Sequence, residues 1–353
     1  MVKVDIVSPV GGAAGGIENV ILSWTRKLDP CIINLRVFHC HKGTDYLQGY
    51  EKAYSTGKDF LKADIDELTE AYTEFIKKHG APDICIATNW PMMVKNCDIV
   101  RRDMGLSSMK LFSWIHNRIS AYEEEGLLGA ADMVCADAHL TINRRMSADI
   151  KAVDPSATIY EIGNPVALRK RTDGSKDPLL LTYVGRLSYI KRLDIILEAM
   201  YRAKAPWRLK IIGDGEIRPE VEGWIELLRL SDRVELLGWQ QDPWAFCQDS
   251  DILVMASEYE GFGLVAFEAS STGKMVISTP VDGISDYIEN EKNGYIYPFE
   301  DAPFLADILN GISEGSIKRC DPDECRRSVE RFSEDNYFKR LTGILTGTER
   351  TVQ

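Results

Sequence analysis

The sequence has few of the features that mark membrane-spanning or nucleic-acid-binding proteins. No apolar run approaches the about 20 residues that a helix needs to cross a bilayer. Basic residues are outnumbered, 42 against 54 acidic ones, which gives a formal net charge of −12. A nucleic-acid backbone needs a basic partner surface, so this charge disfavours such a ligand. Composition therefore points away from both classes.

The eight cysteines also lack the short paired spacings of metal sites and redox motifs. Cys85 lies in an apolar run, where a reduced thiol behaves as a small hydrophobic side chain. Residues 1–7 are typical of a strand, whereas a secretion signal has a basic start and a longer apolar run. We therefore expect a cytoplasmic protein, with peripheral contact to the inner face of the plasma membrane as an open alternative.

What the sequence does contain is a regular alternation of short apolar runs and amphipathic stretches. Over 353 residues this pattern predicts an α/β protein with two Rossmann-like domains facing a central cleft. A polar segment with glycine and proline at residues 162–177 predicts the boundary between them. Residues 59–78 predict a long helix. The predicted strands are residues 2–7, 32–38, 83–87, 111–115, 133–136, 179–184, 208–212, 234–237, 252–255 and 276–278.

Residues 258–268 carry the most information about function. A buried run is followed by acids and a glycine turn, and a helix is predicted to begin at Leu264. The first backbone N–H groups of a helix have no partner within it, which predicts a phosphate near Gly263 and Leu264. Glu260 and Glu268 flank this position and could accept hydrogen bonds from sugar hydroxyls. The alternative is a strand–turn–helix corner with two solvated acids.

Two cations that could balance a phosphate follow another predicted strand. Arg186 stands just after residues 179–184, and Lys191 is five residues further along the chain. Ligands bind at the carboxyl edge of such sheets, so both cations are expected in the same cleft as the 258–268 loop. A forked donor and a point charge suit a diphosphate, with a solvated turn as the alternative.

In the first half, a glycine-rich loop and one histidine are the candidates. The loop at residues 9–18 contains four glycines, which allow close backbone approach to a ligand. Their spacing is not GxGxxG, which disfavours a dinucleotide. His116 directly follows a predicted strand, and this position favours a functional role over a structural one.

No catalytic metal is predicted. His39 and His41 lack the additional histidine or acidic partners that a metal site requires. The Asp-x-Asp motifs at residues 64–66 and 321–323 lie in a long helical pattern and in a turn before a helix. We interpret both motifs as solvated acids, and the acidic residues 123–125 as an exposed helix start.

In this order, these segments resemble the GT-B glycosyltransferases of family 4, the retaining class. The resemblance covers nearly the whole chain, and a narrower likeness is to the bacterial lipopolysaccharide 1,6-galactosyltransferase group. The broader resemblance is carried by residues 15–18, 116, 163–166, 185–187, 191, 211–215 and 260–268. The narrower one is carried by residues 112–114, 164–166, 238–240 and 243–244.

The resemblance implies a role for each candidate. Arg186 and Lys191 would neutralise the donor diphosphate as it leaves, and His116 would contact the donor sugar. Glu260 would bind the hexose hydroxyls and Glu268 the ribose, so that His116, Arg186, Lys191 and Glu260 form the catalytic set. The other implied donor-binding residues are Gly15, Gly16, Gly238, Trp239, Phe262, Gly263 and Leu264.

The resemblance also implies the organisation of the chain and its reaction. Residues 1–165 would form the acceptor-side domain, residues 166–333 the nucleotide-sugar domain, and residues 334–353 a helix that returns to the first domain. The reaction would be retaining and metal-independent, moving galactose or glucose from a UDP-sugar without a cofactor. The acceptor would be a hydroxyl of a surface glycan or a lipid-linked precursor.

Two other functions stay open at this point. A nonhydrolysing UDP-sugar epimerase shares the two-domain fold and would form product without an acceptor. A non-catalytic subunit of a glycosylation complex is disfavoured, because the charged cleft residues are present. The acceptor is not predicted, and residues 39–60 match no pattern. Basic residues 95, 101, 102, 110, 144 and 145 are interpreted as solvated surface, with membrane docking as the alternative.

Overall fold

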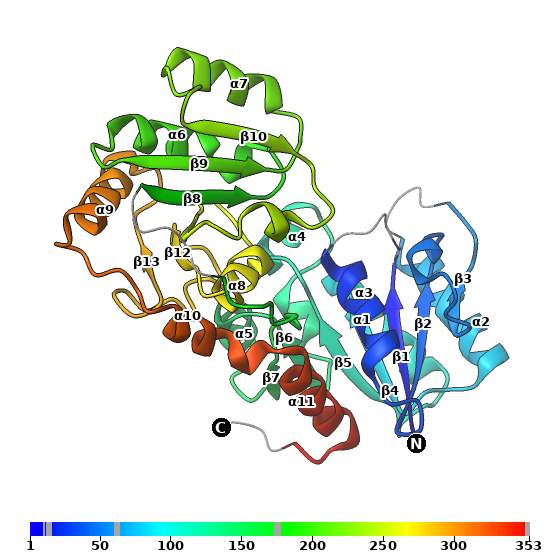
Figure 1. Ribbon diagram of the computed structural model, residues 1–353. Coiled ribbons are helices and arrows are strands. Elements are labelled where there is room, and N and C mark those ends of the chain that lie inside the picture. Colours follow the sequence, from blue (N-terminus) through cyan, green and yellow to red (C-terminus); the bar gives the residue numbers. More distant parts are fainter. Residues whose placement is uncertain (10, 12–15, 60–63, 173–177, 350–353) are drawn as a thin grey trace. The chain divides into compact units, whose positions relative to one another are not determined.

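The computed structural model describes the chain except residues 10, 12–15, 60–63, 173–177 and 350–353. Contacts divide the chain into two compact units. Unit 1 contains Met1–Pro165 and Asp335–Gln353, and unit 2 contains Val166–Glu334. Each unit has a parallel sheet with helices packed against it (Figure 1). The predicted α/β class with two Rossmann-like halves is confirmed.

Unit 1 is built on a seven-stranded sheet in the order β3-β2-β1-β4-β5-β6-β7. Its central strands are largely buried on both faces, which explains why they are rich in apolar residues. The strands are β1 (Val2–Ser8), β2 (Ile33–His39), β3 (Ala53–Ser55), β4 (Ile84–Thr88), β5 (Lys110–Trp114), β6 (Ala138–Thr141) and β7 (Ile159–Glu161). The helices before the boundary are α1 (Gly16–Lys27), α2 (Ile65–His79), α3 (Pro91–Asp103), α4 (Ile119–Glu124) and α5 (Arg144–Val153).

Unit 2 is built on a six-stranded sheet in the order β10-β9-β8-β11-β12-β13. One continuous apolar core joins this sheet to α6, α7 and α9. The strands are β8 (Leu179–Val184), β9 (Trp207–Ile212), β10 (Val234–Gly238), β11 (Ile252–Val254), β12 (Met275–Ser278) and β13 (Gly294–Ile296). The helices are α6 (Leu193–Arg202), α7 (Arg218–Leu227), α8 (Leu264–Ser271), α9 (Ala302–Glu314) and α10 (Pro322–Val329).

One predicted strand is wrong, and three short strands were missed. Residues 130–133 form a 3-10 helix, in which the Asp132 carboxylate accepts the N–H of Gly129, and the strand begins only at Ala138. Val134 is exposed, so the apolar run at residues 133–136 does not have the continuous burial of a central strand. The missed strands β3, β7 and β13 are three residues long and lie at sheet edges, where the hydrophobic pattern is weakest.

The first acid of each Asp-x-Asp motif caps a helix. Asp64 precedes α2 and its carboxylate accepts the N–H groups of Asp66 and Glu67, so the motif starts the helix and does not lie within it. Asp321 precedes α10 and accepts the N–H of Asp323. These capping bonds give the acids a local structural role.

The final helix, α11 (Glu334–Thr346), returns to unit 1 as predicted. Its apolar face is buried in the unit 1 core beside α1. Trp24 of α1 stacks on Trp114 with ring centroids 4.4 Å apart, and its indole N–H donates to the Tyr337 hydroxyl at 3.1 Å. Arg340 of α11 donates to the carbonyl of Glu161. The core of unit 1 therefore depends on residues that follow unit 2 in the sequence.

The described helices include none that is both long enough and apolar enough to cross a membrane. The basic residues of unit 1 mostly have acidic neighbours: Lys95 contacts Asp132 at 3.0 Å, and Arg101 contacts Asp137 at 2.7 Å. Ion pairs of this kind are typical of a solvated face. They favour that interpretation of these residues over membrane docking.

We expect the L341A substitution in α11 to lower the free energy of unfolding by about 2–5 kcal/mol, because it leaves a cavity in the unit 1 core. Equilibrium unfolding in denaturant measures the change. The matched control is K339A on the same helix, whose side chain is exposed and should alter stability by less than about 0.5 kcal/mol. Equal effects of the two substitutions would contradict the packing of α11.

Candidate functional site

The strand order of unit 2 brings two loops together at the carboxyl edge of its sheet. β8 and β11 are neighbours, and the chain runs outward from them in opposite directions, to β9 on one side and to β12 on the other. Ligands bind at such a reversal in open α/β sheets. The loops that follow these strands, residues 185–192 and 255–263, contain Arg186, Lys191 and Glu260.

Lys191 and Glu260 form an ion pair that joins the two loops. The ammonium of Lys191 lies 2.7 Å from Oε1 of Glu260, and the Ser257 hydroxyl donates to the same oxygen at 2.9 Å. The Glu258 N–H donates to the Ile190 carbonyl at 2.9 Å and connects the backbones as well. Lys191 is expected to contact a diphosphate and Glu260 a sugar. In the structure the two side chains neutralise each other.

Arg186 stands on a backbone that is fixed from several sides. The Tyr183 hydroxyl donates to the Arg186 carbonyl at 2.8 Å. A Cβ on Gly213 would lie 1.8 Å from the carbonyl oxygen of Gly185, so glycine is required for this close approach. The Arg186 side chain itself is exposed and has no carboxylate partner among the described residues. Its guanidinium is thus free to bind an anion.

The turn before α8 is shaped to expose the start of that helix. Gly263 has a positive φ of 79°, and a Cβ there would meet the Ile284 side chain at 2.6 Å. Phe262 is buried and stacks on Phe267 at 4.1 Å, so only its backbone is left for a ligand contact. The N–H of Leu264 is in the first turn of α8, where backbone donors lack helical acceptors. The turn therefore presents backbone donors at the start of α8, and binding of a phosphate there stays a prediction.

Glu268, one turn further along α8, is held by a residue that the sequence analysis did not assign. The indole N–H of Trp244 donates to Oε2 of Glu268 at 2.7 Å. Burial raises the pKa of the Glu268 carboxyl, and the Trp244 hydrogen bond partly opposes this. Trp244 is in turn near the Arg169 guanidinium, 5.9 Å from its ring, and Arg169 pairs with Asp242. No sequence spacing indicates this contact, because it forms only when the 243–246 turn packs on α8.

Gly238 and Trp239 lie at the end of β10. Gly238 has a φ of 66°, and its carbonyl accepts the Gly213 N–H at 2.8 Å. This bond ties the loop after β10 to the loop after β9. Trp239 is 72% exposed, which leaves both its backbone and its ring open to a ligand. Both residues are therefore at the same sheet edge as Arg186.

The unit 1 candidates lie at the carboxyl edge of their own sheet. His116 follows β5 with its ring edge-on to Trp114 at 4.3 Å, and its Nε2 has no partner in the described ranges. Burial lowers the pKa of His116 to about 3, so its imidazole is neutral at pH 7. Gly16 is the exposed first residue of α1, and Gly15 falls outside the described residues. That both units contribute to one cleft stays a prediction.

Two Rossmann-like units, each with a parallel sheet, define the fold class of GT-B glycosyltransferases. A family model described as glycosyl transferases group 1 matches residues 167–328, nearly all of unit 2. Unit 2 is thus a glycosyl transferases group 1 domain, and the chain is a glycosyltransferase. The predicted class of enzyme is confirmed.

The chain is similar over most of its length to proteins of lipopolysaccharide synthesis. The lipopolysaccharide 1,6-galactosyltransferase of Escherichia coli is 28% identical over 256 residues, 69% of each chain. Its Salmonella typhimurium counterpart is 26% identical over 360 residues, 97% of this chain and 96% of the relative.

Two solved structures have the same fold. The apo form of the lipopolysaccharide outer core galactosyltransferase WaaB has a TM-score of 0.88 at 24% identity and covers 98% of this chain and 100% of that one. An Anabaena protein, HepE, in complex with UDP has a TM-score of 0.78 at 16% identity, with the same coverage.

We expect the W244F substitution to raise the pKa of Glu268, because it removes the hydrogen bond that lowers it and leaves the burial that raises it. A carboxyl NMR titration measures this pKa, with the resonance assigned by its absence in E268Q. The control is W239F, which alters an exposed ring at the end of β10. An unchanged Glu268 titration in W244F would contradict the contact, as would an equal shift in W239F.

Proposed function

We propose that this chain is a retaining, metal-independent transferase that moves a hexose from a UDP-sugar to a hydroxyl of a surface-glycan or lipid-linked acceptor. Galactose is the hexose we favour, and a lipopolysaccharide precursor is the acceptor. The two curated relatives described above support both choices, since each is named for galactosyl transfer to lipopolysaccharide. A cytoplasmic location, at the inner face of the plasma membrane, stays part of this proposal.

The observation that carries the proposal is the meeting of two cations, an acid and a helix start at one reversal of strand order. A diphosphate needs positive charge and N–H donors, which Arg186, Lys191 and the first turn of α8 supply. A hexose needs hydrogen-bond acceptors, and Glu260 is within reach of the same loops. Glu268, with one oxygen occupied by Trp244, keeps the other for a ribose hydroxyl.

The Lys191–Glu260 ion pair suggests how the donor is bound. A phosphate oxygen offers Lys191 a charge-assisted hydrogen bond, and a hexose hydroxyl offers Glu260 a donor in exchange for the ammonium. The donor would then replace one ion pair by two ligand contacts. During transfer, negative charge grows on the departing diphosphate, and the fixed cations stabilise it most at that stage. No nucleophilic carboxylate is required if the acceptor attacks the face from which the diphosphate leaves.

The neutral state of His116 determines what this residue can contribute. A neutral imidazole can donate or accept one hydrogen bond to a sugar hydroxyl but adds no charge to a donor phosphate. We therefore assign His116 to positioning of the donor hexose. Gly16, whose Cβ position is open, would allow the α1 backbone to approach the phosphates.

We expect R186A to lower kcat/KM for UDP-galactose by about 10²–10³, a loss typical of removing one donor to a charge that develops in the transition state. E260A should also lower kcat/KM, because the hexose loses its acceptor. Steady-state assays with the acceptor glycan give these values. The control is E258A, which removes a neighbouring exposed acid that contacts Arg192. Full activity of R186A and E260A would refute the proposed donor site.

Activity should be unchanged by EDTA, because Arg186, Lys191 and the α8 start supply the positive charge that a metal would otherwise provide. The product glycoside should have the same anomeric configuration as the donor, as read by NMR of the newly formed linkage. Loss of transfer on chelation, with recovery on addition of Mg²⁺ or Mn²⁺, would contradict metal independence. Formation of an isomerised sugar without acceptor would favour an epimerase instead.

A further inference from the structure

Unit 2 contains a cavity of about 580 Å³ whose lining includes four basic side chains. These are Arg169, Lys170, Arg171 and Lys274, and Trp244 and Gln248 also line it. Residues 169–172 precede β8 and Lys274 precedes β12, so the cavity lies near the amino ends of parallel strands. The loops with Arg186 and Glu260 follow the carboxyl ends of strands. The two places are thus at opposite edges of one sheet.

Lys274 is a buried cation in this lining. Its side chain is 2% exposed, and its ammonium donates to the Thr172 hydroxyl at 2.8 Å. No carboxylate within the described part of the chain lies at ion-pair distance from it, and burial lowers its pKa. Nearby groups, Asp251 and Asp249 among them, partly oppose this lowering without contacting the ammonium. A buried ammonium that lacks an ion-pair partner is costly, so the site is better satisfied when an anion is bound. Arg169 adds a buried Nε that likewise has no described acceptor.

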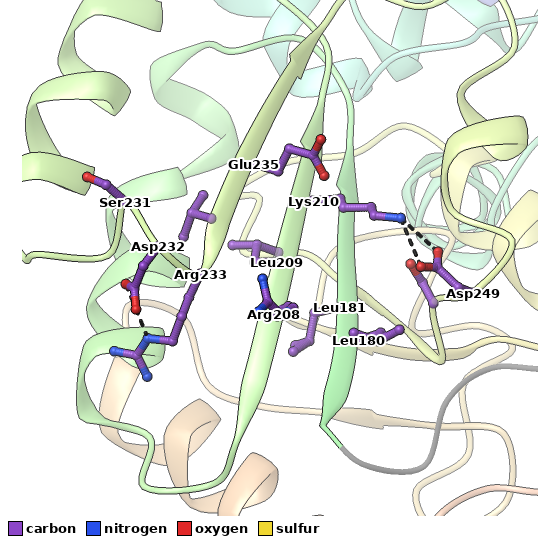
Figure 2. Close-up of a pocket in the computed structure, with 12 residues that line it drawn as sticks. Leu180, Leu181, Arg208, Leu209, Lys210, Ser231, Asp232, Arg233, Glu235 and Asp249 are labelled. Atoms are coloured by element: carbon purple, nitrogen blue, oxygen red, sulfur yellow. Dashed lines mark hydrogen bonds and ion pairs between the residues drawn. The ribbon is translucent and has the colours of Figure 1, made fainter.

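Both acids of the lining already have basic partners. Asp249 accepts two hydrogen bonds from Lys210, at 2.8 and 3.0 Å, as the dashed lines in Figure 2 show. Asp242 pairs with Arg169 at 3.0 Å. Lys170 is exposed and has no described ion-pair partner. Arg171 pairs with Asp323 at 2.8 Å, so Lys170 and Lys274 are the two cations of the lining without a described ion-pair partner. They leave a local positive excess in a chain whose net charge is −12.

Figure 2 shows another cavity of unit 2, which is smaller and shares Asp249 with the one described above. The charges that line the two cavities differ. It measures about 290 Å³ and combines Arg208, Lys210 and Arg233 with acids on the same strands and loops. Its charges largely balance, and Arg233 also contacts Asp232. Of these two cavities, the larger therefore has the surplus of cations.

We propose that the larger cavity binds a phosphoryl group of a ligand other than the sugar donor. A phosphate monoester supplies oxygens for Lys274, Lys170 and the Arg169 Nε, and its double charge matches the local excess. The phosphate comes from a soluble phosphorylated molecule or from a lipid headgroup, which share this chemistry. Because Trp244 lines the cavity and holds Glu268, the bound anion lies next to a residue that orients the proposed ribose ligand.

The test separates this site from the donor site by using an R186A, K191A background, in which the proposed donor cations are removed. Inorganic phosphate is titrated at constant ionic strength and followed by calorimetry. We expect one phosphate per chain to bind in this background. Adding K274M or K170A should weaken binding by about tenfold, the effect of losing one charge-assisted hydrogen bond. K204A, which removes an exposed lysine outside either cavity, should leave the affinity unchanged.

K170A alters an exposed side chain, so its result does not depend on tolerance of a buried substitution at Lys274. Absence of phosphate binding in the R186A, K191A background would overturn the proposal, as would equal binding by K170A, K274M and K204A. Flotation with phosphatidic acid vesicles, against phosphatidylcholine vesicles, identifies the source. Flotation that K170A abolishes supports a headgroup ligand, and phosphate binding without flotation supports a soluble one. Failure of the donor-site predictions would leave these outcomes unaffected.

Discussion

The reversal of strand order between β8 and β11 is the constraint on which the candidate site depends. Parallel strands place all their carboxyl ends at one edge, and the reversal leaves two neighbouring loops there without a crossover between them. Arg186 and Lys191 reach this position from one loop and Glu260 from the other, although about 70 residues separate them in sequence. The strand order of the sheet, rather than any single sequence motif, therefore brings the candidate residues together.

Glycines allow the loops at the carboxyl edge of the unit 2 sheet to pack closely. Gly213 approaches the Gly185 carbonyl, and a Cβ on Gly215 would lie 2.2 Å from the Leu187 carbonyl. The loops after β8 and β9 can thus lie against each other, with the Leu187 N–H donating to the backbone carbonyl of Asp214. Side chains at these positions would separate the loops and displace Arg186. The position of Arg186 therefore depends on these glycines as well as on hydrogen bonds to its backbone.

The central strands and α8 could be predicted because each has a clear local pattern. β1 and β8 are rich in apolar residues, and the start of α8 has a glycine turn followed by apolar residues. The three-residue edge strands could not be predicted, since three residues show no period. The same limit applies within the site. Arg186 and Glu260 follow predicted strands, and this position is why the sequence indicates them as candidates. The contact of Trp244 with Glu268 exists only after packing and has no sequence signal.

The ion pair between Lys191 and Glu260 also bears on how the reaction cycle ends. Under the proposed function, UDP without its hexose would offer phosphate oxygens to Lys191 but nothing to Glu260, whose return to Lys191 would then compete with the product. An intact donor would satisfy both groups and meet less competition. Internal neutralisation of the empty site would thus select the complete nucleotide sugar over the spent nucleotide, and would hasten product release without any moving lid.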